Sequence, residues 1–204
     1  MSVKKIHPTL QGLAQSGFTL LEVLITLIVL AIGLLGLASL QSKIQLGQVE
    51  SYQRAQAVLL LEDMVNRINT ASLTTVGNPT AAPYVTGTTS ALGVGDAQPT
   101  SCAGLAVGLA RDQCEWSNAL KGASEIKGTG NVGAMVSARG CVEQLQAENP
   151  APTVCTPGIY RVSVVWQGLN QTVEPALLCA AGSGYGNGYR RVISTQLVIG
   201  LPSC

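Results

Sequence analysis

The chain has 204 residues, of which 11% are charged, and its formal net charge is +1 at pH 7. Its single histidine is His7, its 11 acidic residues follow no recognisable spacing, and it contains no C-x-x-C pair. This composition argues against a Ser-His or Cys-His nucleophile, a pair of catalytic carboxylates and a zinc centre, so we expect neither an enzyme nor a bound metal or cofactor.

A short basic leader and an apolar run open the chain. The leader carries Lys4 and Lys5, and the 23 residues of Phe18–Leu40 include Glu22 as their only charge. A helix of that length is about 35 Å long, enough to cross the ~30 Å hydrocarbon layer of a membrane. The positive-inside rule places Met1 in the cytoplasm and the C-terminal part across the membrane.

The small residue expected at a signal cleavage site lies before the apolar run. No A-x-A-like site follows Leu40, whereas Gly17 directly precedes Phe18. We therefore predict cleavage between Gly17 and Phe18. This would remove residues 1–17, His7 included, and leave the apolar helix on the product.

The junction reads Gly17-Phe18-Thr19-Leu20-Leu21-Glu22 and continues into the apolar run. This order resembles the class III signal of type IV prepilins and pseudopilins. The resemblance implies that a prepilin peptidase cuts after Gly17 and methylates the amine of Phe18, and that Glu22 meets the N-terminal amine of a neighbouring subunit in a filament. The alternative for Glu22 is an acid in the first helical turn, which the helix dipole favours by about 0.3–1 kcal/mol.

The helix is predicted to continue beyond Leu40, because no proline occurs between Leu40 and Pro79. Apolar residues in its second half recur at three- and four-residue steps, and charged pairs at i,i+4 support the same geometry. The apolar stripe is Val58, Leu61, Val65 and Ile68, and the pairs are Glu50 with Arg54 and Asp63 with Arg67. A helix over about 18–69 would be roughly 78 Å long. We expect residues 18–40 to lie in lipid and residues 41–70 to pack on a globular head.

The segment 71–130 is predicted to be a connecting region with one short helix. Its first part is rich in Thr, Gly, Ala and Pro, which is typical of surface loops. Helical spacing around Trp116 then predicts a helix over about 104–120. We expect Trp116 to be a packing anchor.

The remaining segment, 131–204, is predicted to form an antiparallel sheet. Apolar and polar residues alternate over 159–167, a second strand is predicted over 189–200, and a third is expected over 136–145. The connections are too short for helical crossovers, so the strands should be antiparallel. The expected class is α+β: a long N-terminal helix, its first half embedded in the membrane, packed on an antiparallel sheet with disulfide-bonded loops.

All six cysteines lie beyond the apolar run: Cys102, Cys114, Cys141, Cys155, Cys179 and Cys204. An even number confined to one side of the membrane predicts disulfides formed in an oxidising compartment. Six cysteines allow fifteen connectivities, and the sequence does not choose among them. Sequential pairing closes short local loops, so we expect Cys102–Cys114, Cys141–Cys155 and Cys179–Cys204.

Further segments resemble one pilin subgroup, the minor pilins called PilV, or type IV pilus modification proteins. They are Leu30–Ala38, Trp116–Leu120, Gly140–Val142, Tyr160–Gly168 and Arg190–Val192. The resemblance implies a low-abundance subunit that primes pilus assembly near the fibre tip and supports twitching motility. The implied partners are other minor pilins, the major pilin, the prepilin peptidase, the inner-membrane assembly platform and a large tip adhesin. The chain would be an inner-membrane protein with a periplasmic C-terminal domain before assembly, and part of the extracellular pilus afterwards.

Two other functions fit parts of the sequence. A minor pseudopilin of a type II secretion system would share the leader and the helix, although a head of about 130 residues with three predicted disulfides favours the pilus. An adhesin or other binding subunit at the fibre tip is the second alternative. Without residues 1–17 the chain has ten basic and eleven acidic side chains, so its net charge is −1. We therefore expect no nucleic-acid partner.

Overall fold

The structure is a computed structural model that describes residues 17–74, 80–128, 130–133 and 135–201. The chain divides into two compact units, and the division falls between Gln45 and Leu46. The predicted leader before Gly17 and the C-terminal Cys204 lie outside the described residues.

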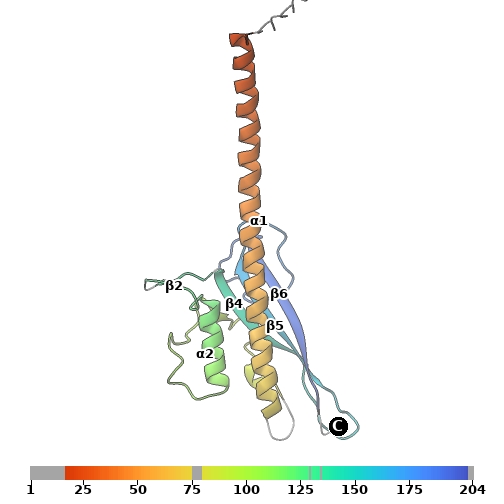
Figure 1. Ribbon diagram of the computed structural model, residues 1–204. Coiled ribbons are helices and arrows are strands. Elements are labelled where there is room, and N and C mark those ends of the chain that lie inside the picture. The colour runs from red at the N-terminus through yellow and green to blue at the C-terminus, as the bar shows by residue number, and fades with distance from the viewer. Residues whose placement is uncertain (1–16, 75–79, 129, 134, 202–204) are drawn as a thin grey trace, which may run out of the picture. The chain divides into compact units, whose positions relative to one another are not determined.

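One helix, α1 (Leu20–Thr74, 55 residues), begins in the first unit and ends in the second (Figure 1). It ends later than predicted, because no glycine or proline interrupts the sequence between Gly47 and Gly77. In the first unit, every described side chain is exposed. In the second unit, one face of α1 is buried; its apolar residues are Ala57, Leu61, Met64 and Ile68.

The predicted apolar stripe on α1 is only partly correct. Leu61 and Ile68 are buried, but Val58 is 39% exposed and Val65 only packs against the edge of the core. Met64, fully buried, occupies the centre of the contact instead. The buried face therefore lies to one side of the stripe that the sequence pattern indicated.

The second unit contains a four-stranded antiparallel sheet in the order β1-β4-β5-β6. Its strands are β1 (Leu92–Gly93), β4 (Val136–Gln146), β5 (Gly158–Gln167) and β6 (Arg190–Ile199). The three long strands lie where they were predicted. The short β1 was not predicted, and neither was the separate pair of β2 (Ile126–Lys127) and β3 (Gly130–Asn131). The architecture is the expected α+β one, with α1 packed on an antiparallel sheet.

The two faces of the sheet bury different clusters, because side chains alternate along each strand. On one face, alternate residues of β5 pack with α1, the second helix α2 (Leu109–Leu120) and the short 3-10 helix η1 (Ala82–Tyr84). Those residues are Tyr160, Val162, Val164 and Trp166. The opposite face carries a smaller cluster of Cys141, Val165, Cys179, Ala180 and Tyr185. Figure 1 shows α2 on the same side of the sheet as α1.

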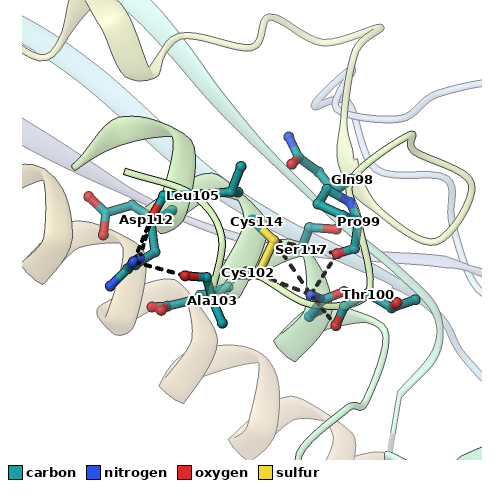
Figure 2. Close-up of a disulfide and its surroundings, with 12 residues drawn as sticks. Gln98, Pro99, Thr100, Cys102, Ala103, Leu105, Asp112, Cys114 and Ser117 are labelled. Carbon is teal, nitrogen blue, oxygen red and sulfur yellow. Dashed lines mark hydrogen bonds between the residues drawn. A yellow bond between two sulfur atoms is a disulfide. The ribbon is translucent and has the colours of Figure 1, made fainter. Parts of the chain in front are cut away.

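Helix α2 begins at Leu109, five residues later than the predicted start. Its N-cap residue, Gly108, has φ 114° and ψ −152°, a backbone conformation that cannot belong to a right-handed helix. The residues before it form a loop whose carbonyls accept hydrogen bonds from Arg111, including a 2.6 Å bond from Nη2 to Leu105 O. Figure 2 shows this loop joined to α2 by the expected Cys102–Cys114 disulfide.

Trp116 on α2 is the packing anchor that the sequence predicted. Its side chain is fully buried, and its indole Nε1 donates a 2.7 Å hydrogen bond to Leu60 O of α1. Its ring lies against β4 at Gly140, where an added Cβ would overlap the ring. A larger residue at position 140 would therefore force the Trp116 ring or the backbone of β4 to move.

The second described disulfide joins Cys141 of β4 to Cys179, with Cα atoms 5.8 Å apart. The predicted pairings Cys141–Cys155 and Cys179–Cys204 are therefore wrong. Cys155 lies in the β4–β5 connection, and the five residues from Cys141 to the end of β4 already extend about 16 Å.

The reason for the observed pairing is the path of the chain between β5 and β6. This segment folds over the sheet face that α1 leaves free, and there Cys179 packs with Cys141. Hydrogen bonds hold it in place: Ala180 N donates to Thr88 O at 2.9 Å, and the Tyr185 hydroxyl donates to Ser137 O at 2.9 Å. Local loop length could not reveal a contact made across the sheet.

Candidate functional site

The candidate site is the start of α1, where the predicted processing and assembly residues lie. Gly17, Phe18 and Thr19 precede the helix in a non-helical conformation, and all three are exposed. The Phe18 side chain is 83% exposed. No described residue covers the peptide bond between Gly17 and Phe18, so a peptidase could reach it.

Thr19 caps the helix. Its Oγ1 accepts a 3.2 Å hydrogen bond from the backbone N–H of Glu22, and its carbonyl accepts a 3.3 Å bond from Val23 N. A threonine followed three residues later by glutamate is the sequence pattern of a capping box, which satisfies N–H groups that the first helical turn leaves unpaired. No role was predicted for Thr19, although its spacing to Glu22 indicates this cap.

Glu22 is thereby placed at the third position of α1, near the positive end of the helix dipole. Its side chain is exposed, and none of the ion pairs within the described part of the chain involves it. The cap explains why an acid is tolerated at this position. A cationic partner for its carboxylate would have to come from outside the described chain, so the role of Glu22 in assembly stays a prediction.

The rest of the first unit is an apolar helix without a core. Every large apolar side chain from Leu20 to Ile44 is at least 49% exposed. Helix α1 is long and apolar enough, by length and composition, to cross a membrane. Exposed apolar surface on this scale marks contact with lipid or with another protein.

The second unit uses its charged groups to join its own elements. Arg67 of α1 donates to Asp63 at 3.0 Å, which confirms that predicted pair, and it reaches α2 through Asp112 at 3.2 Å and Glu115 at 2.7 Å. Burial alone would lower the pKa of Arg67, but the hydrogen bonds to Glu115 and Asp63 raise it. The Tyr84 hydroxyl donates to the same Asp112, and burial together with this bond raises the pKa of Tyr84.

Asp96 joins the loop after β1 to α2. It pairs with Lys121 and accepts hydrogen bonds from the Ser117 hydroxyl at 2.7 Å and from Gly93 N at 2.8 Å. Burial acts to raise the pKa of Asp96, but its bonds to Lys121 and Ser117 outweigh burial and lower it. Among the described residues, no group of three or more His, Cys, Asp or Glu side chains is placed to hold a metal ion.

The second predicted ion pair on α1, Glu50 with Arg54, does not form. The Glu50 carboxylate turns to the loop after β5, where it accepts hydrogen bonds from Leu169 N and Asn170 N, each at 3.2 Å. It also lies 3.6 Å from Arg191 Nη2. The loop draws Glu50 away from Arg54, because two backbone N–H groups and a guanidinium outcompete one exposed side chain.

Comparison with known proteins gives one match. Residues 13–38 match the family model of the prokaryotic N-terminal methylation motif. No curated protein matches the chain, and no solved structure matches it either.

The match covers the junction that the sequence analysis singled out. It supports a type IV pilin or pseudopilin, a structural and non-catalytic kind of protein, and it implies processing by a prepilin peptidase and assembly into a pilus or pseudopilus. The apolar helix fits membrane anchoring before assembly.

Proposed function

We propose that this chain is a minor pilin of a type IV pilus, of the PilV kind, which helps to prime pilus assembly at or near the fibre tip. The observation that carries the proposal is the methylation motif over 13–38 at the start of an apolar helix, with every described side chain of the first unit exposed. Lipid surrounds such a helix before assembly. The same helix of other subunits surrounds it in the fibre.

Cleavage between Gly17 and Phe18 creates the group that assembly needs. It frees the amine of Phe18, which the peptidase then methylates. Glu22 is the acid nearest to that new terminus. An ionised carboxylate is destabilised where water is excluded, so the N-terminal amine of a neighbouring subunit stabilises Glu22 in the fibre.

The disulfides support export of the head. Cys102–Cys114 and Cys141–Cys179 form in an oxidising compartment, which fits a periplasmic head before assembly and an extracellular one afterwards. The partners of such a subunit are the other minor pilins, the major pilin, the inner-membrane assembly platform and a large tip adhesin.

Mass spectrometry of the protein recovered from membranes and from sheared fibres tests the processing step. The proposal expects a chain that begins at Phe18 and carries one methyl group. A chain that retains residues 1–17, or one cut beyond Leu40, contradicts it.

Glu22→Ala tests the assembly step. We expect normal amounts of processed protein in the membrane and a large loss from sheared fibres, because the carboxylate that pairs with the neighbouring amine is gone. Glu62→Ala is the matched control, since Glu62 is an exposed acid on the same helix that takes part in none of the described ion pairs. Equal incorporation of the two variants would contradict the role of Glu22.

The methylation motif is common to pilins and pseudopilins, so a minor pseudopilin is the nearest alternative. Deletion of the gene separates the functions when piliation, twitching, protein secretion and adhesion are scored independently. Loss of pili and twitching supports the minor pilin. Loss of secretion alone supports the pseudopilin, and intact fibres that no longer adhere support a tip adhesin.

A further inference from the structure

A pocket of about 400 Å³ opens on the second unit between α1 and the sheet. It is lined by Gly47, Glu50, Ser51, Arg54, Trp166 and Arg191. Trp166 of β5 and Arg191 of β6 lie directly opposite each other in the antiparallel pair. The other four residues belong to two turns of α1, which begin two residues after the last residue of the first unit.

Two of the charged groups in this pocket already have partners. Glu50 accepts from Leu169 N, Asn170 N and the Asn170 side-chain amide, and it lies 3.6 Å from Arg191. Arg191 also donates to the carbonyls of Gly188 and Asn170. These contacts fix both side chains against the loop after β5 and cancel their charges.

Two hydrogen-bond donors remain. Arg54 is exposed, and no carboxylate of the described residues lies within ion-pair distance of it. Trp166 is 4% exposed, yet its indole N–H has no acceptor within the part of the chain that the structure describes, unlike the indole of Trp116. Neither side chain can accept a hydrogen bond. With Glu50, Arg54 and Arg191 in its lining, the pocket has a net charge of +1, which favours an anionic ligand that accepts hydrogen bonds.

We infer that this pocket binds the carboxylate of an aspartate or glutamate side chain from a neighbouring subunit of the filament. The inference rests on the proposed function. Arg54 supplies the charge, and Trp166, which also lines the pocket, supplies an indole N–H that makes no hydrogen bond to a described residue. An isolated surface ion pair would contribute little, but a carboxylate that meets both a guanidinium and an indole N–H is held by charge-assisted, directional bonds.

The position of the pocket on the chain argues for a subunit as the source of the carboxylate. The lining residues of α1 follow directly on its apolar stretch, so a chain that packs along that stretch and extends toward the head would meet Gly47 and Arg54. A contact here would extend the apolar packing with one polar, register-setting interaction. It would specify which acidic neighbour is accepted, because an apolar helix alone discriminates poorly among similar helices.

Charge reversal tests the pocket. For Arg54→Glu we expect normal processing at Gly17, normal membrane levels, and about tenfold less protein in sheared fibres, a change of about 1.4 kcal/mol. Lys127→Glu is the control, because Lys127 is an exposed cation on β2 and is not among the residues that line the pocket. Trp166→Phe, which keeps a ring and removes the N–H, should lower incorporation by a smaller factor.

A photo-crosslinking residue at Ser51 identifies what enters the pocket of the full chain in intact cells. We expect a cross-link to another pilin at or beside an acidic residue, and loss of that cross-link in Arg54→Glu. Changing that acid to arginine should then restore incorporation of Arg54→Glu. A cross-link to lipid, failure of the charge swap, or wild-type incorporation of Arg54→Glu overturns the pocket inference. Absence of the wild-type chain from fibres would overturn the filament proposal itself.

Discussion

The two units of the chain differ in where their apolar surface goes. In the first unit, the apolar side chains of α1 project in all directions and none is buried. In the second unit, the same helix is amphipathic and buries Met64 and Ile68 completely against a sheet. One continuous helix thus serves two environments. The head has its own core, whereas the first unit requires lipid or neighbouring chains.

The largest effect is expected from Trp116→Ala, which removes the central contact of the head. The free energy of unfolding should fall by about 3–5 kcal/mol, because a fully buried aromatic side chain leaves a cavity. Denaturant titration of the detergent-solubilised protein, followed by near-UV circular dichroism, measures it. Trp116→Phe should cost less, since it loses mainly the hydrogen bond to Leu60. An unchanged head stability in Trp116→Ala would contradict the assigned core.

The two described disulfides should differ in their effect on the same head. The chain-entropy model gives about 4 kcal/mol for Cys141–Cys179, which spans 38 residues, and about 3 kcal/mol for Cys102–Cys114, which spans 12. Paired serine variants, compared by thermal unfolding, test this order. Peptide mapping without reduction tests the pairing, and recovery of a Cys141–Cys155 peptide would contradict the Cys141–Cys179 bridge.

A smaller effect, dependent on pH, is expected at Asp96. Its pKa in the folded state lies below its ordinary value of 3.8, so its carboxylate stabilises the head above that pH, and the contribution is lost as the pH falls through the folded-state pKa. Asp96→Asn should reduce stability by about 2 kcal/mol at neutral pH. The difference from wild type should shrink in acid. A difference that stays constant from about pH 7 to about pH 2 would exclude a role for the charge.

The smallest effect on head stability is expected from a substitution in the first unit. Two leucines of α1, one in each unit, test the comparison directly. Leu27 is 61% exposed and Leu61 is 7% exposed, and both belong to α1. Leu61→Ala should destabilise the head by about 2–5 kcal/mol, whereas Leu27→Ala should change its unfolding by less than about 0.5 kcal/mol. Equal effects in the same denaturant titration would mean that the first unit contributes to the folded core.

The sequence predicted helices and strands correctly where the spacing of apolar residues follows the repeat of the element. The period of the strand around Val162 and the helical spacing around Trp116 reflect which side of an element meets the core, so both elements could be predicted. The start of α2 could not, because helical spacing gives no information on the backbone of Gly108. The Cys141–Cys179 disulfide depends on how a loop crosses the sheet, and no local pattern encodes that path.

In the candidate site and on the rest of α1, too, some features could be predicted from the sequence and others could not. Gly17, Phe18 and Glu22 were recognisable because their order is a contiguous motif. The capping role of Thr19 could also have been predicted, because Thr19 and Glu22 have the spacing of a capping box. The partner of Glu50 was predicted wrongly, because helix geometry suggested Arg54 and tertiary structure supplied a loop more than one hundred residues further along the chain. Contacts within an element follow from spacing, whereas contacts between elements require the fold.

The hydrogen bond from Trp116 to Leu60 has a consequence for the outer surface of the head. The bond reaches one particular carbonyl of α1, and successive carbonyls around an α-helix are about 100° apart. The indole therefore helps to fix the rotational phase of α1 on the head, together with the buried face that includes Met64 and Ile68. That phase decides which side chains of the helix remain turned toward other molecules, Arg54 and Glu62 among them. A residue deep inside the core thus contributes to the arrangement of side chains that a docking chain would contact.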